Sequence, residues 1–231
     1  MRTQWDSWSR TDLETLRGML CFCVTCWTCG LGEPCLAGPH AGGTLIVHAN
    51  ESIVYTDGSN GFCWQSELES CATATSTVST ETSIPIVFYV FAAFPAESNP
   101  ELIAVSFGIE YDAALLSIVE SGHCAEIEQH TDEWPLPGSG LVLMWNQPQH
   151  ERLLELAWFA GVSQADEPSA FELGEHPTQG GVFIGDWPQT PVDYIADYGA
   201  LGFGVPGYLP CPDGPVPTNE RSWGGVKAAF W

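Results

Sequence analysis

Alternation of apolar and polar residues is clearest between Leu102 and Tyr111. The apolar positions are Ile103, Val105, Phe107 and Ile109. This period of two predicts a β-strand with one buried face. Asp112 then interrupts the pattern, and an aspartate can hydrogen-bond its own backbone to start a turn. We therefore expect a tight corner, followed by a second strand at Leu115–Val119.

Similar apolar runs predict further strands. The run Ile84–Phe94 is rich in β-branched and aromatic residues, so we expect a strand buried on both faces. Its part Ile86–Phe94 is expected to pair antiparallel with Leu102–Tyr111. Leu153–Ala160 fits a strand or a helical turn, and we favour a strand because the apolar run continues to Gly161. The other expected strands are Thr44–Ala49, Leu141–Trp145, Ala170–Leu173, Val182–Ile184 and Leu201–Val205.

Short strands separated by Gly and Pro, without alternating βα units, predict an all-β protein built as an antiparallel β-sandwich. One motif agrees with this class. The spacing Phe-x-Ile-x-Tyr-Asp-x-x-x-Leu-x-Ile is made by Phe107, Ile109, Tyr111, Asp112, Leu116 and Ile118. It resembles the strand and corner of cohesin-like and related immunoglobulin-like bacterial sandwiches. The resemblance implies an immunoglobulin-like architecture. Cohesins usually carry Pro after the Asp, where this chain has Ala113, and no dockerin-binding residues can be matched.

Residues 1–41 are predicted to be a signal peptide and a poorly ordered amino-terminal segment. Three Arg precede the apolar run Gly18–Cys29, and small-x-small sites follow at residues 35–37 and 39–41. This pattern predicts a bacterial protein that is secreted or held at the cell surface. The rival interpretation is a Cys-rich intracellular protein that binds zinc or an iron–sulfur cluster. Its ligands would be Cys21, Cys23, Cys26 and Cys29.

The remaining chain divides into a β-sandwich at 42–205, a Pro-rich linker at 206–220 and a tail at 221–231. The tail pattern Trp-Gly-x-Val-Lys-x-x-Phe, at residues 223–230, resembles the C-terminal tails of secreted proteins from uncultured Gram-negative bacteria. That resemblance implies a sorting or docking signal; a tail folded onto its own domain is the alternative. No apolar run reaches the ~18–20 residues of a membrane-spanning helix.

Four cysteines follow residue 41, and an even number in an exported domain predicts disulfides. They are Cys63, Cys71, Cys124 and Cys211. Of the three connectivities, the simplest joins Cys63 to Cys71 and Cys124 to Cys211.

The formal net charge of −23 disfavours nucleic acids and anionic membranes as partners, since both reward basic patches. Solubility by self-repulsion explains such a charge, and a saline habitat or a calcium-loaded surface protein would give the same composition. Asp57, Ser59 and Asn60 could offer oxygens to calcium, but the twelve-residue calcium loop is not met, and Asp-Gly and Asn-Gly favour a turn. We expect no cofactor.

No nucleophile elbow, metalloprotease motif or phosphate-binding loop is present in the sequence, and we assign no catalytic residue. One loop holds several titratable side chains, which could bind a metal or transfer protons together with His150 or His176. These are His123, His130, Asp132 and Glu133. Solvated histidines beside acids are the commoner explanation, and we assign no metal site.

Aromatic residues are the better candidates for binding. Trp145 and Trp158 lie in apolar strands and are expected in the core. Trp134 and Trp187 each precede Pro in a loop, and we expect them to be exposed for stacking on sugar rings. The sequence thus favours an exported or cell-surface structural or binding module without catalysis, whose partner is a glycan or another surface protein. The alternatives are a secreted carbohydrate-directed hydrolase and the Cys-rich metal-binding protein.

Overall fold

A computed structural model describes residues 38–58, 61–80, 84–164, 167–186 and 190–212. All of these belong to one compact unit. Several sequence-based predictions lie wholly or partly outside the described residues. They are the signal peptide, the cysteines at 21–29, Ser59, Asn60, Trp187, the end of the linker at 213–220, and the tail at 221–231. Within the described part of the chain, no helix is long and apolar enough to cross a membrane.

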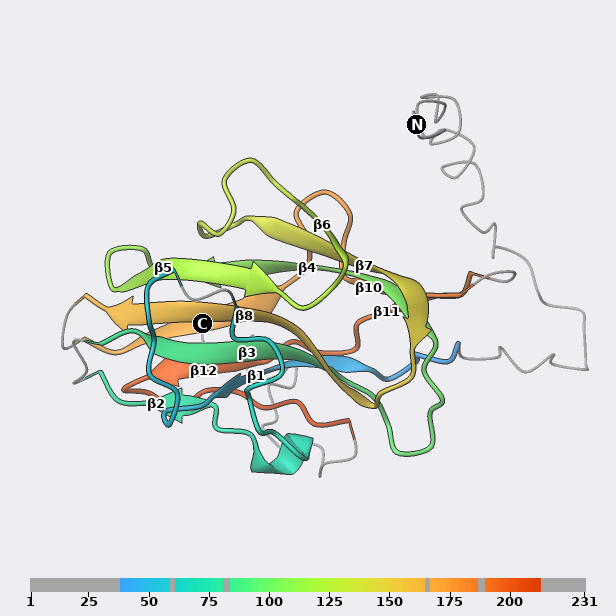
Figure 1. The fold of residues 1–231 in the computed structure, drawn as a ribbon, viewed down its shortest axis with the longest axis horizontal. Helices are drawn as coiled ribbons and strands as arrows, with labels where there is room; N and C mark the ends of the chain where they lie inside the picture. Colours follow the sequence, from blue (N-terminus) through green and yellow to red (C-terminus); the bar gives the residue numbers. More distant parts are fainter. Residues whose placement is uncertain (1–37, 59–60, 81–83, 165–166, 187–189, 213–231) are drawn as a thin grey trace, which may run out of the picture. The chain divides into compact units, whose positions relative to one another are not determined.

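The strands form two sheets (Figure 1), as an antiparallel β-sandwich requires. The four-stranded sheet has the order β1 (Thr44–Ala49), β3 (Ile86–Ala93), β8 (Leu153–Ser163) and β5 (Leu116–His123). The path of the eight-stranded sheet is β11 (Val192–Tyr194), β10 (Val182–Gly185), β4 (Leu102–Tyr111), β9 (Ser169–Gly174), β12 (Ala200–Phe203) and β2 (Thr77–Val78). Off this path, β7 (Gly140–Gln149) pairs with β4, and β6 (Ile127–His130) pairs with β7.

The predicted pairing of Ile86–Phe94 with Leu102–Tyr111 is wrong. These runs form β3 and β4, which lie in different sheets. Both edges of β3 are occupied, by β1 and β8, and β4 pairs instead with β7, β9 and β10. The connection between β3 and β4 therefore crosses from one layer to the other. The two apolar runs meet through side chains across the core, not through a hydrogen-bonded ladder.

Aromatic side chains from both sheets fill the centre of the sandwich. Phe88 of β3 and Phe159 of β8 stack with ring centroids 5.5 Å apart. Phe171 of β9, from the opposite sheet, lies 4.9 Å from each of them. All three side chains are fully buried, so this cluster contributes strongly to the burial that holds the layers together.

The corner after β4 forms as the sequence predicts. Oδ1 of Asp112 accepts a hydrogen bond from the backbone N–H of Ala114 at 2.8 Å. The backbone oxygen of Asp112 accepts from both Leu115 and Leu116. These bonds satisfy the turn locally and start β5 directly behind it.

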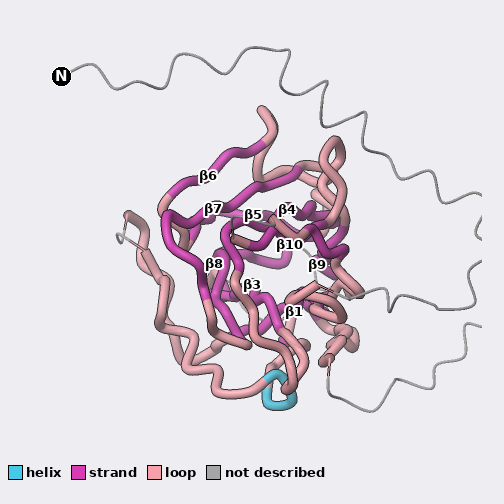
Figure 2. The backbone as a smooth tube through the Cα atoms, turned by 90° about the vertical axis from the view of Figure 1, so that its right-hand side faces the viewer, coloured by secondary structure: helices cyan, strands magenta, loops and turns pink. Residues whose placement is uncertain are grey.

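The outer face of the four-stranded sheet is covered as well. The described residues of 50–76, which we call the β1–β2 segment, lie over it and include a 3₁₀ turn at Cys71–Thr73. Figure 2 shows this segment as a loop outside β8 that leads to the helical turn in cyan. Phe62 of the segment packs edge-on against Trp158 of β8, with centroids 4.8 Å apart. This cover explains why every residue of β3 is buried, as the sequence predicts for that run.

Candidate functional site

Two disulfides fix the β1–β2 segment to the sandwich. Cys63 is bonded to Cys124, next to the end of β5, and Cys71 is bonded to Cys211. The simplest connectivity expected from the sequence, Cys63 with Cys71, is therefore wrong. The segment crosses the sheet towards β5 and returns towards β1, which places the two cysteines beside different partners. Cα–Cα distances of 5.5 and 5.7 Å suit the disulfides that form.

Trp64 follows the first of these cysteines and is 65% exposed. Its φ of 66° lies in the left-handed region, which is uncommon for a bulky residue. Glu67, three residues later, has a φ of 57°. Such conformations cost about 1 kcal/mol or more each, and they persist only where the surroundings hold them. The exposed indole therefore stands on a strained and firmly held backbone.

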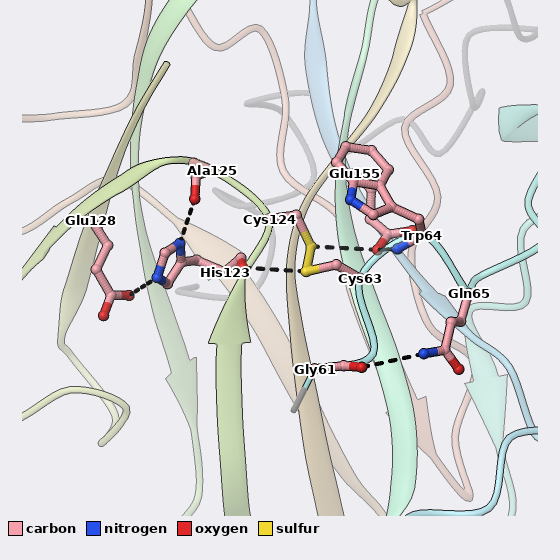
Figure 3. Close-up of a disulfide and its surroundings, with 9 residues drawn as sticks. All are labelled: Gly61, Cys63, Trp64, Gln65, His123, Cys124, Ala125, Glu128 and Glu155. Carbon is pink, nitrogen blue, oxygen red and sulfur yellow. Dashed lines mark hydrogen bonds and ion pairs between the residues drawn. A yellow bond between two sulfur atoms is a disulfide. The ribbon is translucent and has the colours of Figure 1, made fainter. Parts of the chain in front are cut away.

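The buried carboxylate of Glu155 holds that backbone. The backbone N–H of Trp64 donates to Oε1 of Glu155 at 2.6 Å, and Figure 3 shows the pair beside the disulfide. The same oxygen lies 3.4 Å from Sγ of Cys124. Glu155 is only 3% exposed, and burial raises the pKa of its carboxyl group. Hydrogen bonds from Ser66 and Trp64 act in the opposite direction.

Ser66 is fixed from the other side by β1. Its backbone oxygen accepts from Nδ2 of Asn50 at 3.1 Å and lies 3.3 Å from Nε2 of His48. Nδ1 of His48 accepts a hydrogen bond from the backbone N–H of Thr75, so Nε2 carries the proton of the neutral ring. Burial lowers the pKa of His48, which keeps the ring in that form. The chain on both sides of Gln65 is thus anchored to the sheet.

Trp64 and Glu67 both line two surface hollows. One hollow, of about 600 Å³, is also lined by Glu69, Leu153 and Glu155. The other, of about 660 Å³, is lined by polar and apolar residues of the β1–β2 segment, including Asn50, Ser52, Val54 and Gln65. We call Trp64, Glu67, Glu69 and the two hollows the Trp64 surface. An aromatic face between carboxylates is chemically suited to a cation or to a ring with several hydroxyl groups.

Positive charge is scarce around this surface. In the described ranges Arg152 is the sole Lys or Arg. Its guanidinium donates to the backbone oxygen of Ala96 at 2.7 Å. Glu67 and Glu69 are both exposed. No Lys or Arg lines the two hollows beside Trp64, but Arg152 lines a third hollow together with Glu69. The Trp64 surface therefore carries two exposed carboxylates with one guanidinium at its edge.

The sequence pointed instead to Trp134 and Trp187. Trp134 is half-buried, and its ring packs against Phe159 of the core with centroids 5.6 Å apart. The bond between Trp134 and Pro135 is cis. Trp187 lies outside the described residues. As expected, Trp145 and Trp158 are buried. The sequence did not single out Trp64 among several tryptophans. Its position in a turn-rich loop beside Cys63 was the one sequence signal that could have indicated its exposure.

The titratable residues of the 123–133 region are dispersed over β5, β6 and the loop that follows. His123 lies 3.6 Å from Glu128 and contacts the backbone oxygen of Ala125, as Figure 3 shows. His176 is buried elsewhere and accepts backbone hydrogen bonds from its own turn. Among the described residues, the one group of three side chains close enough for a metal is Cys63, Cys124 and Glu155. Its two sulfurs are joined in a disulfide and are not thiolate ligands.

No family model matches the sequence, and no curated protein matches it. Solved structures with a similar fold include the cohesin module of a family 33 glycoside hydrolase from Clostridium perfringens. It is 10% identical with a TM-score of 0.44, and the match covers 70% of this chain and 94% of that one.

A type I cohesin–dockerin complex from Clostridium thermocellum matches at 9% identity and a TM-score of 0.43, over 69% of this chain and 93% of that one. A non-cellulosomal cohesin from Archaeoglobus fulgidus matches at 9% identity and a TM-score of 0.34, over 69% and 91%. These likenesses concern the fold alone.

Proposed function

We propose that this protein is an exported binding module without catalysis, which holds a basic segment of a partner protein on the Trp64 surface. The observation that carries the proposal is the exposure of Trp64 on a backbone fixed by a disulfide and by Glu155. A large aromatic side chain exposed on a rigid support loses little conformational freedom when it binds. Strained backbone held in this way is typical of functional sites.

Charge favours a basic partner over a neutral one. A Lys or Arg side chain placed over the indole gains a cation–π interaction. Glu67 and Glu69 lie on the same surface and would accept its hydrogen bonds. The net charge of −23 would also speed the approach of a positively charged partner. A neutral glycan would use the indole face but gain nothing from that charge.

Export supports the same function. The signal-peptide pattern precedes a domain in which all four described cysteines form disulfides. Disulfides persist in oxidising compartments. An exported module of this kind would meet its partner at or beyond the cell surface.

Calorimetric titration of the exported protein tests the proposal. The probe is a short peptide of alternating lysine and glycine, and its control has glutamine in place of lysine. The lysine peptide should bind, and added salt should weaken the binding. Trp64→Ala should weaken it about fivefold, the equivalent of about 1 kcal/mol from a cation–π contact. Tyr194→Ala, which removes a 79% exposed aromatic from β11, should leave it unchanged.

Other outcomes are distinguishable. Equal binding by the Trp64→Ala and Tyr194→Ala variants would mean that net charge alone attracts the peptide, and would overturn the site. Trp64-dependent binding of neutral gluco- or xylo-oligosaccharides, without binding of the lysine peptide, would replace the basic partner by a glycan. Turnover of such an oligosaccharide would replace the binding module by the hydrolase.

A further inference from the structure

The first residues that the structure describes are hydrogen-bonded to the sandwich. The backbone N–H of Gly38 donates to Oδ1 of Asp193 at 3.1 Å, and that of His40 donates to Oδ2 at 3.0 Å. Asp193 belongs to β11, at the edge of the eight-stranded sheet. One carboxylate thus holds two residues that lie 155 and 153 positions before it in the sequence.

His40 is also part of the core. Its side chain is fully buried, and its ring lies 5.6 Å from that of Phe94 and 6.2 Å from that of Phe183. Nε2 accepts the backbone N–H of Glu101 at 3.2 Å, and Nδ1 lies 3.4 Å from Oδ2 of Asp193. His40 therefore fills space between the sheets and satisfies a backbone donor as well.

These contacts distinguish the two small-x-small sites in the sequence. A cut after Ala41 would remove Gly38 and His40. It would leave a gap beside Phe94 and Phe183, and the N–H of Glu101 and the carboxylate of Asp193 would lose the partners described above. A buried cavity and unpaired buried polar groups both destabilise the folded state. A cut after Ala37 keeps every one of these contacts.

A cut after Ala37 also improves the contact at Gly38. Hydrolysis of the Ala37–Gly38 bond consumes one water, breaks the C–N bond, and releases Ala37 as a carboxylate and Gly38 as an α-ammonium group. The nitrogen that now donates one N–H, 3.1 Å from Oδ1 of Asp193, would then carry three protons and a positive charge. A side chain at position 38 would collide with the carboxylate, so glycine is needed for this approach.

We propose that a signal peptidase cuts this chain between Ala37 and Gly38, and that the new α-ammonium group of Gly38 docks onto Asp193. Cys35 and Ala37 provide the small residues that such a peptidase requires before the cut. The proposal rests on the export proposed above. It makes the mature amino terminus a structural element that closes the sandwich beside β11.

The amino terminus of the full chain, produced in an exporting bacterial host, tests the inference by sequencing and intact mass. Gly38 at the terminus is the expected result. Gly42 at the terminus would overturn the cut site but leave export standing. A full-length chain retained inside the cell would overturn export itself.

Two variants sharpen the assignment. Leu in place of the residue before the cut blocks cleavage there. Ala37→Leu should therefore abolish the Gly38 terminus, and Ala41→Leu should leave it unchanged. The reverse pattern would assign the cut to Ala41.

Docking has a separate readout in the exported protein. At neutral pH the paired α-amino group of Gly38 should react about tenfold more slowly with an amine-reactive ester than the same group in Asp193→Asn. Glu97→Gln, which removes an exposed carboxylate elsewhere, should not change the rate. Equal rates in all three proteins would show that the terminus does not dock on Asp193.

Discussion

The backbone N–H of Trp64 donates a 2.6 Å hydrogen bond to the carboxylate of Glu155, which links the β1–β2 segment to β8. This bond couples an exposed aromatic side chain to a charge buried against the outer face of the four-stranded sheet. Glu155 has no Lys or Arg beside it in the hollow that it lines, so its ionised form depends on hydrogen bonds from Trp64 and Ser66.

Glu155 should make stability depend on pH. Burial raises the pKa of Glu155 above its ordinary value of 4.5. The folded state therefore binds the proton more tightly than the unfolded state does, and the ionised form opposes folding. This contribution to the free energy of unfolding should be largest below pH 4.5 and fall as the pH rises through the raised pKa.

Urea unfolding of the native protein and of Glu155→Gln, measured from acid to neutral pH, checks this dependence. The variant should lack the fall assigned to Glu155, and its amide oxygen can still accept from Trp64. Identical pH profiles for the two proteins would contradict the account. Glu120→Gln is an unsuitable control, because Glu120 accepts a hydrogen bond from Tyr55; the exposed Glu97→Gln serves instead.

Trp64→Gly should make the protein more stable while it weakens ligand binding. Glycine adopts a φ of 66° without the steric cost that Trp64 bears, so the free energy of unfolding should rise by about 1 kcal/mol. Glu67→Gly should also raise the free energy of unfolding, because Glu67 has a positive φ as well. Gln65→Gly, between them and without a positive φ, should lower stability instead. Denaturant titration decides the signs, and a destabilised Trp64→Gly would mean that the indole supports the fold.

Trp134 should behave as a core residue. Its ring packs on Phe159, so Trp134→Ala should lower the free energy of unfolding by about 2–3 kcal/mol. Binding of the lysine peptide to the folded variant should be unchanged. Calorimetry below the unfolding transition separates the two effects, and a loss of affinity in the folded Trp134→Ala protein would restore the role expected from the sequence.

The two disulfides should contribute unequally to the free energy of unfolding. Their sequence separations are 61 residues for Cys63–Cys124 and 140 for Cys71–Cys211. Chain entropy gives about 4 and about 5 kcal/mol for loops of these sizes. Replacing Cys63 and Cys124 by Ser should also release the Trp64 surface and weaken peptide binding.

Replacing Cys71 and Cys211 by Ser should affect stability more and binding less. Urea unfolding and calorimetry of the two double variants measure both quantities. Equal losses of affinity in the two variants would contradict the specific link between Cys63–Cys124 and Trp64.

Much of the fold was predictable because local patterns set it. The period of two predicted β4, and Asp112 predicted its corner. The expected single buried face was wrong, because Ala104, Ser106 and Gly108 on the other face are buried as well. The unbroken apolar run of β3 predicted burial on both faces. Pairing was not predictable, because the side-chain pattern shows which faces of a strand are buried but not which strands hydrogen-bond to its two edges. The β3–β4 error arose there.

The candidate site depends on contacts that have no local signature. The exposure of Trp64 and the partial burial of Trp134 depend on how their loops pack on the sandwich, and the sequence shows only that both residues lie in loops. Glu155 stands in an apolar strand, but its carboxylate finds donors only after the β1–β2 segment closes over it. The pairing of the cysteines also depends on the path of the β1–β2 segment over the four-stranded sheet.

The most direct test of binding at Trp64 follows the indole N–H signals of the exported protein by ¹⁵N NMR during titration with the lysine–glycine peptide. The signal that disappears in Trp64→Ala identifies Trp64. We expect this signal to shift with the peptide and to return when salt is added, while the signals of buried Trp145 and Trp158 stay fixed. A Trp64 signal that does not move while the peptide binds would place the interaction elsewhere and contradict the proposed function.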